Sequence, residues 1–334
     1  MKDQYKRGGI MPIRFKFWVI ILGIALLFTW TSPVIGSSID QLEKLANSDL
    51  IPEMRTAASK ALARKYVNEK FPSNELVRIA GAAGTDQLRN AATIALSRRY
   101  KDAKRVGSLK KALKKVNRLE EKVKAGESTV VRKAASSALS FYYVAFNVNN
   151  VKGYSMSELE EIAITGNKKG LKEAAATALE FVYPNHYSAE KLINLIKTSS
   201  HESIKQGAAG ALAIRYFSKM PPDPDIQELR RIASNEAKNR WLREASGRAF
   251  GELASGKVDS KELKELALRG NTEEIRSGAA SAWAENLIES GKTKEELLRM
   301  ACAVTGSASP AYRSAVVSAL ADRMFKSTGK VLGG

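Results

Sequence analysis

The sequence predicts an all-α fold, an α-solenoid in which about eight helix pairs stack into a right-handed superhelix. Three observations support this prediction. An alanine-rich motif, seen clearly at residues 88–96, recurs eight times at spacings of 33 to 43 residues. Its large and small apolar positions fall on one face of a helix. A second helical pattern precedes each copy, so each unit is expected to be helix, turn, helix.

The second helix of each unit carries the motif. Positions in the motif are counted from its basic residue, which is position zero. The position before that residue is large and apolar, position two is small, position six is alanine and position seven is large. At about 100° per residue these positions form one stripe, whose small members allow a neighbouring helix to approach closely. A bulky residue at Ala95 or Ala138 is therefore expected to overpack the contact, at a cost of about 1–3 kcal/mol. The eight basic residues are Arg55, Arg89, Arg132, Lys172, Lys205, Arg243, Arg276 and Arg313.

The first helix of each unit is predicted from a Leu-x-x-(Leu/Ile)-Ala signature, as in Leu42, Leu45 and Ala46. Capping pairs stand before several of these helices, where a side chain can accept from the free amides of the first turn. The pairs are Ser38 with Gln41, Ser155 with Glu158, Asp225 with Glu228, Asp259 with Glu262, and Thr293 with Glu296. Turns rich in Gly, Asn and Ser follow the first helices and separate them from the second.

This combination of signatures resembles HEAT repeats of the bacterial type, including the related bilin-lyase repeats. The resemblance covers nearly all of residues 38–326 and implies the fold rather than a function, because the matching residues are packing residues. HEAT turns commonly carry an acid that pairs with the basic residue of the motif. Here Asp49 and Asp86 fit that place in the first two turns. The third turn offers only Glu127, the fourth offers no acid, and the fifth offers only Glu202. The acid–base ladder is therefore expected to be incomplete.

The chain of 334 residues carries a formal charge of +19 and contains 44% hydrophobic residues, enough for a packed protein rather than a disordered one. Residues 37–326 are predicted to form one continuous elongated domain, followed by a flexible tail at 327–334. The single cysteine, Cys302, excludes a disulfide within the chain and is expected to be a small buried hydrophobe. The basic excess gathers near the N-terminal end of the domain, since residues 37–126 hold 20 basic and 10 acidic residues.

Residues 1–36 have the composition of a secretory signal. A basic stretch precedes a run of fourteen uncharged residues from Phe17 to Trp30, and small residues follow up to Gly36. Cleavage near Gly36 would export the protein to a periplasmic or extracellular location. The alternative is an uncleaved anchor formed by residues 17–36, although the run is shorter than the roughly 20 residues of a spanning helix. Translation starts at either Met1 or Met11, the latter giving a more usual signal length.

Residues 98–124 form a basic insert in the longest interval between motifs, with twelve basic and three acidic residues. Apolar residues keep helical spacing there, so the segment is predicted to be an extended amphipathic helix with a basic outer face. One interpretation is a solvated face that keeps the protein soluble. The other is a contact site for a polyanion, such as anionic lipid headgroups, an acidic envelope polymer, nucleic acid or an acidic protein. Nucleic acid is the least expected of these partners for an exported protein. Few aromatic residues are interleaved, so base stacking has little support. The candidate anion-binding residues are Arg99, Lys101, Lys104, Arg105, Lys110, Lys111, Lys114, Lys115 and Arg118.

Position nine of the motif changes in an ordered way along the chain, from basic to apolar to acidic. Its residues are Arg64, Arg98, Phe141, Phe181, Ile214, Glu252, Glu285 and Asp322. One interpretation places the apolar members in the core between repeats. The other is a graded groove that binds an extended segment of a partner protein. Position four is expected to be exposed beside it, as a smooth wall of small side chains: Ser59, Thr93, Ser136, Ala176, Ala209, Gly247 and Ala280. Tyrosines at position eleven are interpreted as structural.

Catalytic and metal-binding patterns are not apparent. The two histidines are His186 and His201, and only His201 has an adjacent acid, Glu202. A hydroxylase built from similar repeats needs several His-Glu pairs to hold two irons, and one pair cannot do so. No residue pattern indicates the pigment site of a bilin lyase. Both enzyme classes are therefore remote alternatives, and no cofactor or metal is expected. The sequence therefore predicts a non-enzymatic scaffold that binds a partner protein, with electrostatic attachment through residues 98–124 as the alternative.

Overall fold

The computed structural model describes residues 38–48, 51–82, 85–100, 109–125, 129–149, 151–218, 225–303 and 309–326. Within these ranges it contains sixteen α-helices, one short 3-10 helix at Tyr183–Asn185, and no strand. Even-numbered helices are the first members of the pairs: α2 (Ile39–Ala46), α4 (Ser73–Ala82), α6 (Leu109–Ala125), α8 (Met156–Thr165), α10 (Ala189–Thr198), α12 (Ile226–Ala233), α14 (Ser260–Arg269) and α16 (Lys294–Cys302). Odd-numbered helices carry the motif: α3 (Pro52–Asn68), α5 (Asp86–Tyr100), α7 (Thr129–Val148), α9 (Lys169–Val182), α11 (Glu202–Phe217), α13 (Arg240–Ala254), α15 (Glu273–Glu289) and α17 (Pro310–Lys326).

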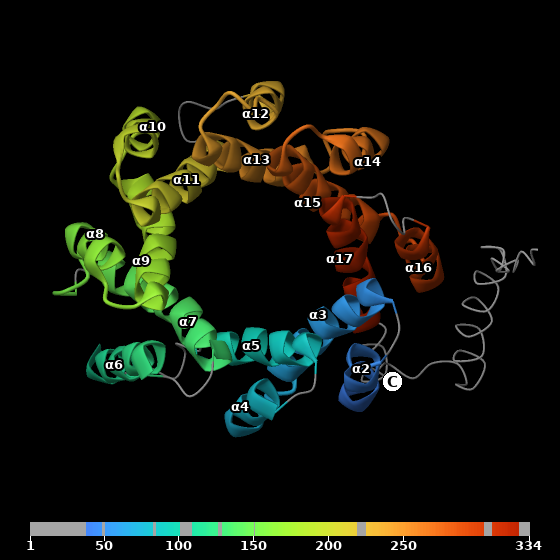
Figure 1. Ribbon diagram of the computed structural model, residues 1–334, viewed down its shortest axis with the longest axis horizontal. Coiled ribbons are helices and arrows are strands. Elements are labelled where there is room, and N and C mark those ends of the chain that lie inside the picture. Colours follow the sequence, from blue (N-terminus) through green and yellow to red (C-terminus); the bar gives the residue numbers. More distant parts are fainter. Residues whose placement is uncertain are drawn as a thin grey trace, which may run out of the picture.

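The eight helix pairs form a closed ring (Figure 1). The odd-numbered helices surround a central opening, and each even-numbered helix packs on the outside of the odd-numbered helix that follows it. The last inner helix, α17, packs beside the first, α3. The paired helices predicted from the sequence are confirmed. The elongated right-handed superhelix is not confirmed, because the last inner helix packs beside the first and the pairs close into a ring.

The contact that closes the ring repeats the contact between successive pairs. Within the ring, Arg243 at the start of the α13 motif lies 3.1 Å from Glu274, which stands two residues before the α15 motif. At the closure, Arg313 of α17 lies 3.8 Å from Glu53, which stands two residues before the α3 motif. The same two repeat positions therefore meet in both places, so α3 serves as the next repeat for α17.

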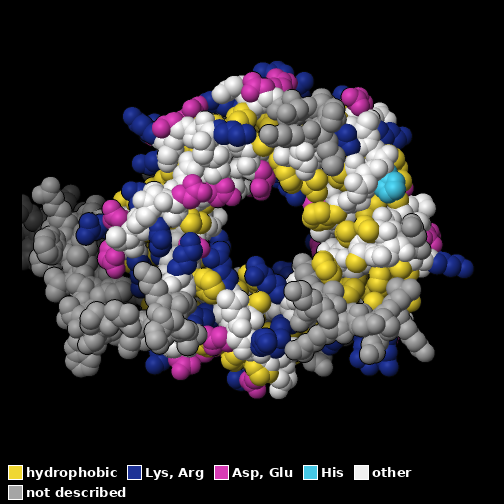
Figure 2. Space-filling view, turned by 180° about the vertical axis from the view of Figure 1, so that it is seen from behind, with side chains coloured by type: hydrophobic (Ala, Val, Ile, Leu, Met, Phe, Trp, Pro, Cys, Tyr) yellow, Lys and Arg dark blue, Asp and Glu magenta, His cyan; other side chains and the backbone are white. Residues whose placement is uncertain are grey.

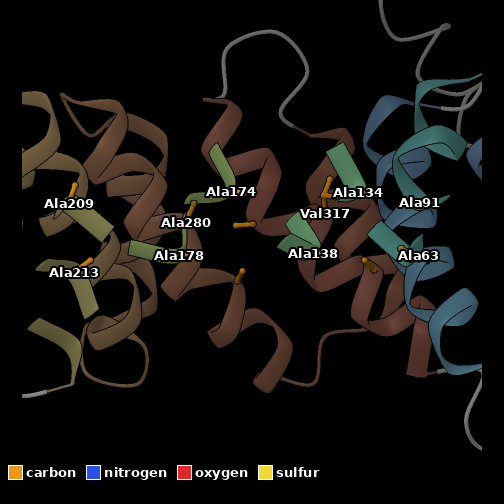
Figure 3. Close-up of a cluster of buried hydrophobic side chains, with 14 of the residues drawn as sticks. Ala63, Ala91, Ala134, Ala138, Ala174, Ala178, Ala209, Ala213, Ala280 and Val317 are labelled. Atoms are coloured by element: carbon orange, nitrogen blue, oxygen red, sulfur yellow. The ribbon is translucent and has the colours of Figure 1, made fainter. Parts of the chain in front are cut away.

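Alanine and glycine line the contacts between inner helices. Ala134, Ala138, Ala174 and Ala178 are 0–1% exposed, and they belong to a cluster of small side chains that reaches across neighbouring inner helices (Figure 3). Position four also belongs to this contact, which corrects the expected exposed wall. Ser59, Ser136, Ala176, Ala209 and Ala280 are all at most 7% exposed, Gly247 is buried, and Thr93 alone is partly exposed. Since the neighbouring inner helix covers position four, these small residues set the helix spacing.

Hydrogen bonds join the two helices of a pair and the successive inner helices. The Tyr66, Tyr143 and Tyr183 hydroxyls donate to Glu43, Glu120 and Glu160 of the outer helices, at 2.5, 3.0 and 2.9 Å. The Oγ of Ser59 donates to the Gln87 carbonyl at 2.6 Å, and that of Ser136 donates to the Gly170 carbonyl at 2.7 Å. These three position-eleven tyrosines therefore have the structural role expected of them.

In several pairs, the basic residue of the motif holds the turn inside its own pair. Arg89 and Lys205 pair with Asp86 and Glu202 at 2.6 and 3.0 Å, as the turn acids predict. Where no acid is available, Lys172 donates to the Ile164 carbonyl at 2.7 Å, near the C-terminus of α8. A cation there complements the free carbonyls of the helix end. Asp49 and Glu127 lie outside the described residues.

The predicted helix starts are largely correct. Complete capping boxes form at Ser38, Ser155 and Thr293, and the Asp259 side chain accepts from the amides of Lys261 and Glu262. The prediction is wrong for Asp225, whose side chain makes no capping hydrogen bond.

No helix within the described ranges combines the length and the hydropathy of a membrane span. Residues 1–37 and 327–334, with the predicted signal and tail, lie outside the described residues.

Candidate binding surface on the inner wall of the ring

Position nine faces the central opening, and its eight residues are called the inner wall here. The tyrosines at position eleven point outward, because their hydroxyls bond to the outer helices. Two residues along a helix correspond to a rotation of about 200°, so position nine points away from the outer helices. In this ring that direction is the centre. The residues that the sequence placed in a graded groove therefore share the wall of one opening.

The inner wall has three chemically different arcs (Figure 2). Basic side chains gather over α3 and α5, apolar side chains over α7 to α11, and acidic side chains over α13 and α15. Arg98, Glu252 and Glu285 are exposed, and Arg64 and Ile214 are partly exposed. The graded order predicted from the sequence is therefore present in space, but it runs around a circle instead of along a groove.

The apolar arc consists of exposed side chains, not of core. Phe141 and Phe181 are 43% and 52% exposed, which argues against the alternative that placed them between repeats. Ile94 and Val148, at motif positions five and sixteen, point the same way and are 42% and 66% exposed. These four are the exposed large hydrophobic residues of the described chain, and they come from three consecutive inner helices. Such clustering is typical of an interaction surface.

The two ends of the graded series meet at the closure. Arg64 Nη1 lies 3.2 Å from Asp322 Oδ1, and Lys326 Nζ lies 2.9 Å from Asp322 Oδ2. Asp322 is 8% exposed, so its carboxylate is committed to the contact between α3 and α17 and is not offered to a partner. Beside it, Lys60 Nζ donates to Ser318 Oγ at 3.0 Å. Burial, and secondarily the nearby Arg64 charge, lower the pKa of Lys60.

A cavity of about 530 Å³ joins the apolar and acidic arcs. Phe181, Ile214 and Phe217 form its apolar side, and Glu244, Glu252, Glu273 and Glu274 contribute carboxylates; the remaining lining residues are Arg240, Arg248, Gly251, Ser277, Gly278 and Ser281. Burial raises the pKa of Glu244, against the opposing effect of the nearby Arg248 and Arg240 charges.

An ion pair in this part of the wall joins α9 to α13 and passes over the intervening α11. The Glu180 side chain of α9 lies across Gly210 of α11, where a Cβ would overlap it. It reaches Arg248 of α13, whose Nη2 is 3.0 Å from Glu180 Oε2. A larger residue at this position would displace the Glu180 side chain from its present path.

The basic insert lies mainly on the outside of the ring. Helix α6 has 17 residues, whereas the other outer helices have 8 to 10, which explains the longest interval between motifs. Val116, Leu119 and Val123 bury its apolar face, and Lys114 and Arg118 are exposed. The amphipathic helix predicted from the spacing of the apolar residues is confirmed for Leu109–Ala125, and residues 101–108 lie outside the described residues.

Of the four candidate anion-binding residues whose side chains the structure describes, Arg99 and Lys115 have structural contacts. Arg99 Nη2 donates to the Lys70 and Phe71 carbonyls, at 2.6 and 3.2 Å, just beyond the end of α3. Lys115 Nζ lies 5.2 Å from the centre of the Tyr142 ring. Lys101, Lys104 and Arg105 lie outside the described residues, as do the side chains of Lys110 and Lys111 in the first turn of α6.

A basic cavity beside the insert was not predicted. It has a volume of about 520 Å³ and is lined by residues of α6, α7 and the start of α9, five of which are cationic: Lys124, Arg132, Lys133, Lys168 and Lys169. The pair Lys168-Lys169 was the available signal in the sequence, but nothing local indicates that it meets Lys124.

Metal binding has no candidate site among the described residues. No three His, Cys, Asp or Glu side chains come together there in a suitable cluster.

Comparison with known proteins finds no matching family model and no matching curated protein for this chain.

Proposed function

We propose that this chain is a non-enzymatic scaffold, a HEAT-like α-solenoid closed into a ring, that binds a segment of a partner protein at its inner wall. The observation that carries the proposal is the set of exposed large apolar side chains on α5, α7 and α9, beside a cavity with charged walls; they are Ile94, Phe141, Val148 and Phe181. Exposing large apolar side chains is unfavourable in a monomeric protein unless something covers them. A lining with apolar and charged sectors suits a polypeptide, which presents both kinds of side chain.

The resemblance to HEAT repeats supports the scaffold part of this proposal. Repeats of that kind present a continuous helical surface, and specificity comes from the residues displayed on it. Here the packing positions recur almost unchanged, while the inner wall differs in every sector. Variation confined to the exposed face is expected when the framework is shared and the binding surface is specialised.

The composition of residues 1–36 supports export of this scaffold to the periplasm or the extracellular space after cleavage near Gly36, with anchoring by residues 17–36 as the alternative. Mass spectrometry of the N-terminus of the protein isolated from its producing cells tests this directly. A mature chain that begins near residue 37 supports export by a cleaved signal. An intact chain extracted only by detergent supports the anchor.

Photo-crosslinking tests the binding proposal. A benzoyl-phenylalanine replaces Phe181 on the inner wall of the full chain, and in a matched variant it replaces Glu161, which is exposed on the outer helix α8. Irradiation in the producing cells is expected to give a covalent adduct with one defined polypeptide from position 181 and none with it from position 161. Absence of a polypeptide adduct at position 181, or the same adducts at both positions, contradicts the proposal.

Electrostatic attachment to an anionic surface or polymer is the second candidate function. The basic cavity and the exposed Lys114 and Arg118 favour it, because they place cations from three helices on neighbouring surfaces. Replacing Lys110, Lys111, Lys114 and Lys115 with Glu is expected to abolish binding to vesicles rich in phosphatidylglycerol. Reversing the exposed Lys261 and the partly exposed Lys264 of α14 provides the control. Retention that is unaffected by the reversals and by salt rules this candidate out.

A further inference from the structure

The lining of the cavity between α9, α11, α13 and α15 indicates the chemistry of a ligand more specifically than the rest of the inner wall does. Phe181, Ile214 and Phe217 offer an apolar surface from α9 and α11. Carboxylates from α13 and α15 stand on the other side of the same cavity. An occupant therefore meets apolar and acidic surroundings within the length of a few residues.

The carboxylates of this cavity differ in whether they already have partners. Glu274 pairs with Arg243 at 3.1 Å, so it is used within the ring. Glu244, Glu252 and Glu273 form no ion pair with any residue that the structure describes. These three carboxylates are therefore the groups of the cavity that remain available to a ligand.

The charge balance of the cavity favours a cation. Its lining holds four glutamates and two arginines, a formal excess of two negative charges. Arg248 is engaged with Glu180 at 3.0 Å, and the Arg240 guanidinium lies 5.4 Å from the centre of the Trp241 ring. Burial holds the pKa of Glu244 above its usual value, so an arriving cation would stabilise its ionised form. An acidic ligand would instead add to the negative excess.

We propose that this cavity binds a basic amphipathic segment of the partner, with a large apolar side chain on Phe181 and Phe217 and a neighbouring Lys or Arg against Glu244 and Glu252. The inference rests on the proposed function and adds the chemical class of the partner. Exposed Glu252 and half-buried Glu244 belong to the same inner helix, α13, eight residues apart. Residues at that spacing are offset by about 80° around the helix and about 12 Å along it. Both nevertheless line this cavity, which suits contacts with different side chains of one segment.

Three matched peptides test the inference with the full chain. The first alternates Lys with Leu and Phe, the second has Glu in place of Lys, and the third has Ser in place of Leu and Phe. Fluorescence anisotropy of the labelled peptides gives the affinity for each. The cationic apolar peptide is expected to bind at least about tenfold more tightly than the other two, since each contributes only one of the two kinds of contact.

Variants of the ring locate the binding. Glu244→Gln with Glu252→Gln is expected to weaken binding of the cationic apolar peptide about tenfold. Phe181→Ser, which alters a side chain that is 52% exposed, should weaken all apolar peptides without unfolding the ring. Glu161→Gln removes one charge from the outer surface of α8 and should change nothing; circular dichroism verifies that every variant folds.

The outcomes separate the inference from the proposed function. Equal binding of the acidic apolar peptide, lack of binding by all three peptides, or no effect of the glutamate variants overturns the inference. If the acidic peptide binds and Phe181→Ser abolishes that binding, the inner wall still binds polypeptides and the proposed function stands. If no peptide binds and crosslinking at position 181 gives no polypeptide adduct, both are overturned.

Discussion

Arg64 and Asp322 stand 258 residues apart in sequence, and their side chains form a 3.2 Å ion pair where the last inner helix packs on the first. The neighbouring Lys60–Ser318 hydrogen bond spans the same 258 residues. Equal offsets at two successive turns mean that α3 and α17 run parallel in register. The ring is thus closed by a specific contact, and the inner wall is continuous around the opening.

Reversing the charge of Asp322 is expected to open the ring. Asp322→Lys places a buried cation beside Arg64 and Lys326, and like charges in a partly buried site repel strongly. Small-angle scattering should show a larger radius of gyration, while circular dichroism stays helical because each pair keeps its own contacts.

The control for this experiment is Glu75→Lys, which breaks an exposed Arg78 pair elsewhere on the ring and should leave the scattering unchanged. Exchanging both charges, Arg64→Glu with Asp322→Lys, should restore closure. A scattering profile of Asp322→Lys identical to that of the original protein would contradict the role of this pair.

The tyrosine hydrogen bonds predict a loss of stability at alkaline pH. Burial, together with the hydrogen bond and charge of the partner glutamate, raises the pKa values of Tyr66, Tyr143 and Tyr183 above the usual value. The fold therefore favours the neutral phenol, and an unfolded tyrosine loses its proton near about pH 10. This stabilisation is present in full below that pH and declines as the pH rises from there toward the folded pKa values.

Chemical denaturation at a series of pH values measures this effect. Tyr143→Phe removes a bond to a charged acceptor and should cost about 1.5–3 kcal/mol near neutral pH. The triple variant, with Phe at all three positions, should also flatten the decline in unfolding free energy above pH 10. An unchanged alkaline slope in the triple variant would show that other groups cause the decline.

Two glycines lie where neighbouring inner helices touch, and the space around them differs. A Cβ at Gly278 would overlap the Gly247 carbonyl oxygen, whereas a Cβ at Gly207 would sit 3.0 Å from Leu179 Cβ. Gly278→Ala is therefore expected to push α13 and α15 apart and cost about 1–3 kcal/mol. At Gly207 the tight contact is offset by the roughly 1 kcal/mol that Ala gains over Gly in a helix, so Gly207→Ala should be close to neutral. Thermal denaturation of the two variants decides this, and equal costs would contradict the difference in spacing.

Replacing exposed apolar side chains of the inner wall is expected to change the surface of the ring without changing the stability of the fold. Phe141→Ser with Phe181→Ser alters side chains that are about half exposed, so the unfolding free energy should change by less than about 1 kcal/mol. Binding of the dye ANS, which reports exposed apolar surface, should fall. Phe250→Ala is the contrasting variant, because that side chain is 1% exposed and its loss should cost about 3–5 kcal/mol. A large destabilisation by the double variant would mean that the arc is core.

The sequence correctly indicated paired helices and the face that each inner helix buries, because both follow from the spacing of apolar residues along one helix. It also placed Phe181 and Glu252 on a common column, since equal motif positions point in equal directions. It misjudged Ser59 and Ala209, which were expected to be exposed. Their environment depends on how closely the next inner helix approaches, and that distance is a property of two helices together.

By itself, the sequence determined eight helical hairpins, their alanine-lined contacts and a column that changes from basic to apolar to acidic. Only the tertiary structure decided that the hairpins close into a ring, that Arg64 meets Asp322, and that Phe181, Glu244 and Glu252 share one cavity. The physical reason is that closure depends on the small rotation at every inter-pair contact, added around the whole circle. No local pattern of residues specifies such a sum.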